Sequence, residues 1–359
     1  MSLAPTDRSQ AEPTFDIGPK RVGPSGSVYV IAEAGVNHDG DVAVARDLVA
    51  EAAQAGADAI KFQVFSADRL VTRDAPAAEY QRRAGEATTQ HEMLKRLELS
   101  RECFQELADL ARERAIEFLA TPFAVEDLRF LLSLKVAAIK IASTDIVNVP
   151  LLEAAVGAGL PVIASTGAAD IEEIREAVRF FDKAGAGPLA LLHCVSSYPT
   201  PDDQANLAGI ATLARAFGRV AGYSDHTESV TMGAYATAAG ARVIEKHFTL
   251  DRRRPGPDHA FSLEPRGLAE YVHHARHAAR LLGGGRIGPT DAQREVRSLA
   301  RGSVVAAREI APDEVIVRDM LTVKRPGTGI APSEIDKLVG RRAVRRITVD
   351  AIITWGDVR

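Results

Sequence analysis

A unit that recurs eight times between residues 28 and 282 constrains the fold more than any other feature of the sequence. In each unit a short apolar, β-branched run ends in polar or glycine residues, and a helix-like segment or a long connection follows it. The eight runs are 28–35, 59–65, 116–123, 137–143, 161–167, 189–195, 219–227 and 242–250. Short apolar strands that alternate with helices are typical of a parallel sheet buried on both faces. Eight such units over about 250 residues favour an α/β fold of the closed (β/α)8 TIM-barrel type over an open, doubly wound sheet.

The repeating pattern ends at the glycine-rich stretch GGGRIGPT. Beyond about residue 300, short β-like runs separated by turn signals predict a small β-rich domain of about 60 residues that docks on another surface. We therefore predict a loosely ordered leader (1–21), the barrel (22–284), a linker (285–299) and the β-rich domain (300–359). Within the barrel, the charged stretch 66–99 predicts a long loop over the barrel mouth.

Composition excludes several classes of protein. The formal net charge of -4 provides no basic field for nucleic acid or for an anionic membrane. No apolar run approaches the ~20 residues of a membrane span, and the N-terminus lacks the features of a signal peptide. The two cysteines, Cys103 and Cys194, are too few for a disulfide framework and fit a reducing compartment. We therefore expect a cytoplasmic protein.

The carboxyl ends of the predicted strands carry the residues of interest, because barrel active sites occupy that face. These residues are Glu33, Asn37, His38, Lys61, Gln63, Thr121, Lys140, Ser143, Asp145, Ser165, Thr166, Gly167, His193, Ser196, Ser197, Tyr198, Ser224, Asp225, His226, Glu245, Lys246 and His247. Single polar residues in loops more often satisfy backbone groups than perform chemistry. However, Lys61, Lys140 and Glu245 lie inside apolar runs, where an unpaired charge is costly. Their convergence on one rim predicts a functional site.

Part of the chemistry follows from residue type. One lysine and several serines near a glycine suit a phosphate, alone or with a carboxylate: Lys140, Ser143, Ser165, Ser196 and Ser224. His226 and His247, on neighbouring strands, are either hydrogen-bonded core residues or two ligands of a divalent metal ion. Glu33 places a carboxylate on the adjacent strand. Lys246 should point to the opposite face of its strand from His247, so we do not predict a catalytic role for it.

The motifs of the chain resemble those of a known family from about residue 22 to the C-terminus. They are IAEAGVNHDGD, GADAIKFQ, ATPF, IKIAS, STG, LLHCVSSYPTP, GYSDHT, VIEKHFTLDRRRPGPDHAFSLEP and VKRPGTG, in that order. The family is that of the sialic acid synthases, which condense phosphoenolpyruvate with a sugar to make N-acetylneuraminate and related nonulosonic acids. The resemblance implies a (β/α)8 barrel followed by a small antifreeze-like (SAF) domain.

The resemblance also implies roles for individual residues. Carbon 3 of phosphoenolpyruvate would attack the aldehyde of an open-chain N-acylated hexosamine, with Mn²⁺ or Mg²⁺ held by His226 and His247. Glu33, Asp145 and His247 are then the catalytic residues, and the lysine and serines above surround phosphoenolpyruvate. The sugar-binding positions are Gln63, Tyr198, Asp258 and Arg325. Arg325 matches an arginine that the small domain inserts into the partner subunit's barrel, which implies a domain-swapped homodimer.

Three departures from the family pattern leave the acceptor sugar open. Thr144, Val195 and Ala168 stand where glycine, threonine and methionine are frequent in the family. The acceptor is N-acetylmannosamine, a diacetamido-trideoxyhexose of the legionaminate or pseudaminate type, or a rarer sugar. Two other interpretations also remain: a Schiff-base aldolase that uses Lys61 or Lys140, and a non-catalytic sugar-binding protein.

Overall fold

The computed structural model describes residues 13–23, 26–76, 89–285 and 287–359. The chain divides into two compact units, Met1–Gly284 and Gly285–Arg359, each with a hydrophobic core of its own. No helix in the described ranges is long and apolar enough to cross a membrane.

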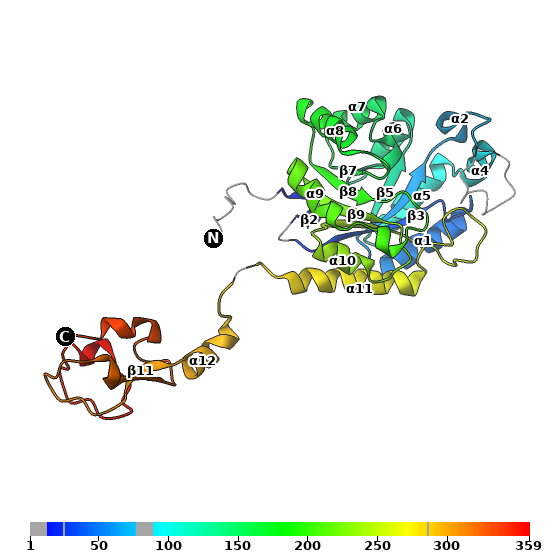
Figure 1. Cartoon of the computed structure of the whole chain (residues 1–359). Helices are drawn as coiled ribbons and strands as arrows, with labels where there is room; N and C mark the ends of the chain where they lie inside the picture. Colours follow the sequence, from blue (N-terminus) through cyan, green and yellow to red (C-terminus); the bar gives the residue numbers. More distant parts are fainter. Residues whose placement is uncertain (1–12, 24–25, 77–88, 286) are drawn as a thin grey trace. The chain divides into compact units, whose positions relative to one another are not determined.

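The first unit is built around eight parallel strands, as the sequence predicts (Figure 1). They are β3 (Tyr29–Gly35), β4 (Ala59–Val64), β5 (Glu117–Pro122), β6 (Ile139–Ile141), β7 (Val162–Ser165), β8 (Leu189–Cys194), β9 (Val220–Asp225) and β10 (Val243–His247). The order across the sheet is β5-β4-β3-β10-β9-β8-β7-β6, and the outer two, β5 and β6, pack together. The sheet therefore closes into a TIM barrel, and its carboxyl ends meet at one mouth.

Helices surround the sheet and bury its outer face (Figure 1). They are α1 (Val42–Gln54), α2 (Ala67–Leu70), α4 (Gln90–Leu97), α5 (Arg101–Glu113), α6 (Val125–Ser133), α7 (Val149–Gly157), α8 (Ile171–Lys183), α9 (Ala208–Phe217), α10 (Met232–Ala238) and α11 (Pro265–Leu282). Local sequence explains where several begin. Asp41 caps α1 by accepting the Ala43 N–H, and Asp170 with Glu173 forms a capping box on α8.

The stretch 66–99 of the barrel, which the sequence predicted as a long loop, contains helices. Helices α2 and α4 lie within 66–99, and residues 77–88 of that stretch lie outside the described residues. Leu94 and Leu97 of α4 pack with Val36 and Phe65 in a small apolar cluster. This cluster brings α4 to the strand ends, although the sequence there is mostly charged.

The prediction of a loosely ordered leader is wrong for residues 15–21. Strands β1 (Phe15–Ile17) and β2 (Lys20–Val22) form an antiparallel hairpin. Phe15 and Ile17 alternate with polar residues, and they pack with inward-facing side chains such as Tyr29 at the amino end of the barrel. The hairpin is thus held by apolar burial. Residues 1–12 lie outside the described part of the chain.

The second unit begins with a helix where the sequence predicted a linker. Helix α12 (Asp291–Ala300) is capped by a box between Thr290 and Gln293. The β-rich character is confirmed by strands β11 (Ser303–Ala306) and β12 (Leu321–Lys324), which pair antiparallel, and by several isolated bridges. Residues such as Ile310, Leu338 and Ile353 form its core.

Candidate active site

Four buried charged side chains meet inside the barrel mouth. Glu33, Lys61, Lys140 and Glu245 come from β3, β4, β6 and β10, and each is at most 5% exposed. Lys61 Nζ lies 2.7 Å from Glu33 Oε2 and 3.6 Å from Glu245 Oε1. Lys140 Nζ lies 3.7 Å from Glu245 Oε2. Carboxylates and ammonium groups therefore alternate around the mouth, and each burial is compensated by an opposite charge.

The two carboxylates of this network differ in proton affinity. Burial raises the pKa of Glu33 to about 7, although Lys61 opposes the change. Burial would also raise the pKa of Glu245, but Lys140, Lys61 and His226 outweigh it and hold that pKa below its usual value. Glu245 is thus a fixed anion, whereas Glu33 can gain or lose a proton near neutral pH. Such a difference suits proton transfer by Glu33.

Hydroxyl groups and a backbone amide gather beside Lys140. Lys140 Nζ donates to Ser165 Oγ at 2.8 Å, and the Gly167 N–H donates to Ser143 Oγ at 3.0 Å. A Cβ on Gly167 would lie 2.3 Å from Ser196 Oγ and 2.8 Å from the Sγ of Cys194. Glycine is therefore required for this close approach. One cation, several hydroxyls and an N–H form an arrangement suited to an anion.

Ser224 joins this group from the other side. Its hydroxyl donates to Glu245 Oε1 at 3.3 Å. The structure thus brings together Lys140 and all four predicted serines, Ser143, Ser165, Ser196 and Ser224, around Gly167 and Glu245.

His226 and His247 lie side by side at the ends of β9 and β10, with ring centroids 5.3 Å apart. His226 Nδ1 lies 2.8 Å from the Val195 carbonyl, so this nitrogen carries the proton and Nε2 is left as a ligand. His247 Nδ1 is buried without a hydrogen-bond partner among the described residues. Burial also lowers the pKa of His247 well below its usual value, so the ring is neutral. Two such nitrogens fit a divalent metal ion.

Two further observations bear on the metal. Burial would lower the pKa of His226, but the Cys194 thiol and the Val195 carbonyl outweigh it and raise that pKa, so an ion at Nε2 would compete with a proton. The described residues include no group of three or more His, Cys, Asp or Glu side chains that could hold a metal. With His226 and His247 as its two imidazole ligands, such an ion would keep other coordination positions open.

A cavity of about 120 Å³ opens beside His247. Its lining residues are Val36, Gln63, Met93, Leu94, Leu97, Tyr198, His247, Pro257 and Asp258. Asp258 Oδ2 lies 3.8 Å from His247 Nδ1, and the Tyr198 ring lies 4.3 Å from that of His226. Gln63 Nε2 lies 3.4 Å from Glu33 Oε1. Three of the four predicted sugar positions therefore line one cavity that adjoins both the histidines and the charged network.

The family models match both units of the chain. The NeuB family model covers residues 48–287, and the SAF domain model covers residues 301–359. The chain belongs to the NeuB family. The N,N'-diacetyllegionaminic acid synthase of Legionella pneumophila is 43% identical over 95% of this chain and 97% of that protein. The synthase of the same name from Campylobacter jejuni is 37% identical over 90% and 98%.

Solved structures agree with this assignment. The N-acetylneuraminic acid synthetase of Leptospira borgpetersenii, crystallised with citrate, is 38% identical with a TM-score of 0.71, over 79% of this chain and 95% of that one. The predicted family and fold, a TIM barrel followed by a SAF domain, are thus confirmed.

Asp145, which the sequence analysis predicted as a catalytic residue, does not join the cluster in the NeuB barrel. Asp145 accepts a hydrogen bond from Asn148 at 2.8 Å, and burial raises its pKa. No described contact joins it to the charged network. Arg325 is exposed in the SAF unit, and no described hydrogen bond or ion pair involves it.

Several residues of the NeuB site lacked an assigned role in the sequence analysis. The sequence predicts Lys61 and Glu245 at the strand-end rim, and Lys61 also as a candidate Schiff-base lysine, but it assigns neither of them a role in the condensation. Cys194 lies 3.8 Å from His226 and 3.6 Å from Ser143. No sequence pattern predicted that Met93, Leu94 and Leu97 of α4 line the cavity beside His247. Val195 contributes its carbonyl, so the hydroxyl of the threonine frequent in the family is not needed for that contact.

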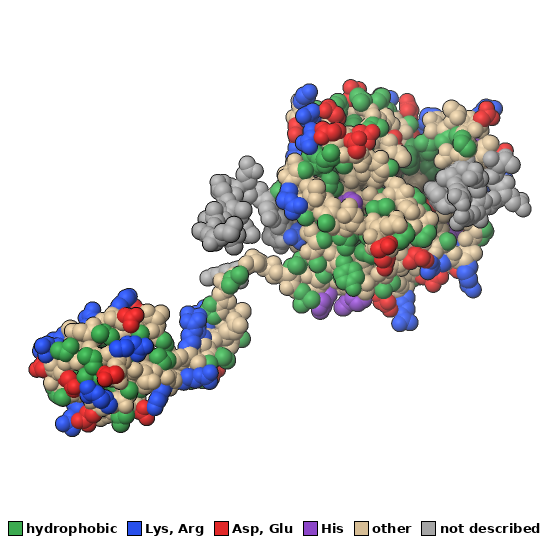
Figure 2. Space-filling view, in the orientation of Figure 1, with side chains coloured by type: hydrophobic (Ala, Val, Ile, Leu, Met, Phe, Trp, Pro, Cys, Tyr) green, Lys and Arg blue, Asp and Glu red, His purple; other side chains and the backbone are tan. Residues whose placement is uncertain are grey.

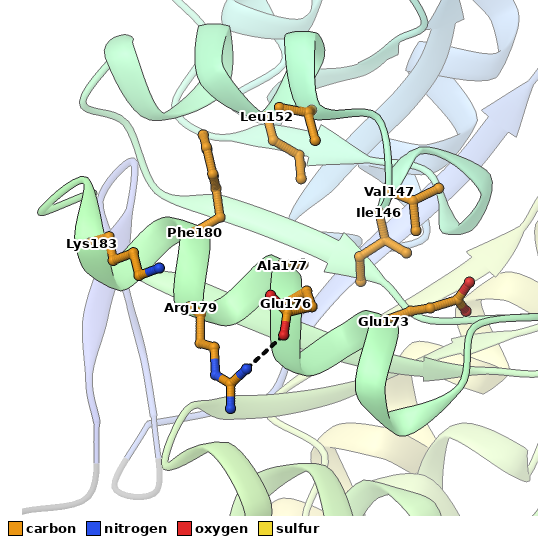
Figure 3. A pocket seen from close by; sticks show the side chains of 10 residues that line it. Ile146, Val147, Leu152, Glu173, Glu176, Ala177, Arg179, Phe180 and Lys183 are labelled. Carbon is orange, nitrogen blue, oxygen red and sulfur yellow. Dashed lines mark hydrogen bonds and ion pairs between the residues drawn. The ribbon is translucent and has the colours of Figure 1, made fainter.

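A larger hollow on the outside of the NeuB barrel does not compete for this role. It has a volume of about 380 Å³ and lies between α7 and α8 (Figure 3). Its lining residues are Ile146, Val147, Val149, Leu152, Glu173, Glu176, Ala177, Arg179, Phe180 and Lys183. None of them belongs to the strand-end cluster.

Acidic and basic side chains are interspersed over the face shown in Figure 2, in keeping with the small net charge.

Proposed function

We propose that this NeuB-family chain condenses phosphoenolpyruvate with an open-chain N-acylated hexosamine, giving a nonulosonic acid and phosphate. One observation carries the proposal: an anion-binding arrangement around Lys140 and Gly167 shares the barrel mouth with the His226–His247 pair. The acceptor that we propose first is a diacetamido sugar, since two relatives that cover most of this chain are named diacetyllegionaminic acid synthases.

The residues around the donor bind and orient it. Lys140, Ser165 and the Gly167 N–H would hold the phosphate and carboxylate of phosphoenolpyruvate, and Lys61 adds a second positive charge at the same mouth. His226 and His247 would hold Mn²⁺ or Mg²⁺, which supplies Lewis-acid polarisation of a carbonyl group when bound. Gln63, Tyr198 and Asp258 would orient the sugar in the adjoining cavity.

Proton transfer falls to Glu33 in this mechanism. Carbon 3 of the donor forms a bond to the aldehyde carbon, and Glu33, with its pKa of about 7, gives a proton to the resulting oxygen. Water adds at carbon 2 of the donor and loses a proton to the solvent or to a nearby carboxylate. The hydroxyl group so formed at carbon 2 loses its proton and becomes the ketone oxygen as the bond between carbon 2 and the phosphate oxygen breaks, and phosphate leaves with the electron pair of that bond. We also propose Asp145 as a catalytic residue.

A phosphate-release assay tests the proposal against its alternatives. With phosphoenolpyruvate and Mn²⁺, we expect release only when a suitable N-acylated hexosamine is added, with the diacetamido acceptor the fastest. A chelator should stop the reaction and added metal restore it. If no sugar in a broad panel triggers release, the proposed function fails. A Schiff-base aldolase would instead give an adduct of Lys61 or Lys140 that borohydride traps, and chelation would not inhibit it.

We predict that Gly167→Ala weakens donor binding without unfolding the barrel. The added methyl group would displace the Ser196 hydroxyl and the Cys194 thiol from the anion site. The KM for phosphoenolpyruvate should rise at least ~10-fold, corresponding to loss of one or two charge-assisted hydrogen bonds. Gly157→Ala is the control, because a Cβ there meets no atom within 4 Å. An unchanged KM in Gly167→Ala would contradict the placement of the donor.

Arg325 tests the proposed domain-swapped homodimer. We expect Arg325→Ala to lower kcat/KM for the sugar ~10-fold or more, as for loss of a hydrogen bond from a charged group. A mixture of Arg325→Ala and His226→Ala chains should recover up to about a quarter of wild-type activity, because a swapped heterodimer contains one intact site of two. No recovery on mixing would argue against the swap. Unaltered kinetics of Arg325→Ala would remove Arg325 from the site.

A further inference from the structure

Strands β9 and β10 present matching triplets of residues at the barrel mouth. Along β9 and its end, Ser224 and His226 serve the site and Asp225 lies between them. Along β10, Glu245 and His247 serve the site and Lys246 lies between them. The two strands are in register, with Glu245 opposite Ser224 and Lys246 opposite Asp225. Because side chains alternate along a strand, Asp225 and Lys246 both point away from the mouth, into the layer between sheet and helices.

Asp225 and Lys246 form an ion pair in that layer. Lys246 Nζ lies 3.1 Å from Asp225 Oδ2, and both side chains are completely buried. The pair contacts neither the anion site nor the cavity. It links the two strands directly behind the two histidines.

The pair also fixes the backbone on either side of His226. Asp225 Oδ1 accepts hydrogen bonds from the Thr227 N–H at 2.9 Å and from the Thr227 hydroxyl at 2.8 Å. Lys246 Nζ donates to the Thr227 carbonyl. The residues before and after His226 are therefore both tied to the pair, and Lys246 is itself the residue before His247.

A tyrosine from the outer layer completes the network. Tyr271 of α11 donates its hydroxyl to Asp225 Oδ2 at 3.0 Å, and its ring centre lies 5.5 Å from Lys246 Nζ. The ring passes so close to α10 that a Cβ on Gly233 would lie 2.6 Å from its Cζ. Asp225 thus receives hydrogen bonds from Tyr271 and Thr227 in addition to its ion pair.

We propose that Asp225, Lys246 and Tyr271 are positioning residues that hold the imidazoles of His226 and His247 at the spacing a divalent metal requires. The inference rests on the proposed function, because it assumes that the two histidines bind a metal. None of the three residues touches a substrate. They act by restricting the backbone that carries both ligands, as partners behind a metal site commonly do.

Direct binding of Mn²⁺ to the full-length protein, followed by its electron paramagnetic resonance signal, tests the inference without turnover. Tyr271→Phe removes only the hydroxyl that donates to Asp225, and we expect it to raise the Kd for Mn²⁺ about 10-fold. Tyr29→Phe is the matched control. Tyr29 is equally buried at the opposite end of the barrel, and its hydroxyl has no hydrogen-bond partner among the described residues. The control should bind Mn²⁺ as the wild type does.

Lys246→Met should have a larger effect on the Kd, and His226→Ala should abolish binding. If Lys246→Met fails to fold because Asp225 is left buried and unpaired, Tyr271→Phe decides alone. A folded Tyr271→Phe variant with a lower melting temperature but a Kd within about twofold of the wild type would overturn the inference, since the network would then serve stability only. If wild type and His226→Ala bind Mn²⁺ equally, it is the proposed metal site that fails instead.

Discussion

Lys61→Met should lower the free energy of unfolding of the barrel by about 3–5 kcal/mol above neutral pH, the range expected when one partner of a buried ion pair is removed. Lys61 lies between Glu33 and Glu245, and all three side chains are at most 6% exposed. Without the ammonium group, two buried carboxylates face each other. Methionine keeps the unbranched apolar stem and most of the length of the side chain, so the loss is chiefly electrostatic.

The destabilisation of Lys61→Met should depend on pH. Burial raises the pKa of Glu33 to about 7 from an ordinary value of 4.5. An acid whose pKa is raised in the folded state lowers the free energy of unfolding only at pH values where the acid is ionised. This destabilisation is absent below the ordinary pKa and complete above the folded-state pKa. Removing Lys61 takes away an opposing effect and raises the Glu33 pKa further. The loss of stability should therefore be largest near pH 8 and shrink toward pH 5.

Urea unfolding measures this prediction, with far-UV circular dichroism reporting the barrel. Trp355, the single tryptophan of the chain, lies in the SAF unit, and its fluorescence should show an unchanged transition for that unit. Lys183→Met is the matched control, because Lys183 is exposed on α8 and should change stability by less than about 0.5 kcal/mol. A pH-independent loss in Lys61→Met, or a loss no larger than in the control, would refute the alternating network as a source of stability.

His226→Ala should abolish Mn²⁺ binding and reduce the rate of condensation by about 1,000-fold or more, because Lewis-acid stabilisation amounts to several kcal/mol. The fold should persist, since the ring makes its one backbone hydrogen bond to Val195 at the mouth and not in the apolar core. His273→Ala is the control, because His273 is exposed on α11. A variant that keeps its rate within about tenfold of the wild type would show that the proposed chemistry does not depend on this imidazole.

Strand alternation made much of the site predictable from sequence. Glu33, Lys61, Lys140 and Glu245 interrupt apolar runs at positions that alternate with core residues. A parallel barrel gathers such positions at one mouth because all its strands run in the same direction. The same reasoning placed Lys246 on the opposite face from His247, and the structure confirms it. The pairing of Lys246 with Asp225 was not predicted, because it depends on register between strands.

The sequence by itself determined the eight strands, the change of architecture near residue 284 and the side chains delivered to the strand ends, because strand periodicity and helix capping are local properties. Only the tertiary structure decided which of those side chains touch. The order Glu33–Lys61–Glu245–Lys140 and the approach of Ser196 and Cys194 to Gly167 join residues that are far apart in the chain. Likewise, Phe15 and Ile17 form a hairpin only because the open end of the barrel offers them an apolar surface. Burial of that kind depends on partners far away in the chain, and no local pattern encodes them.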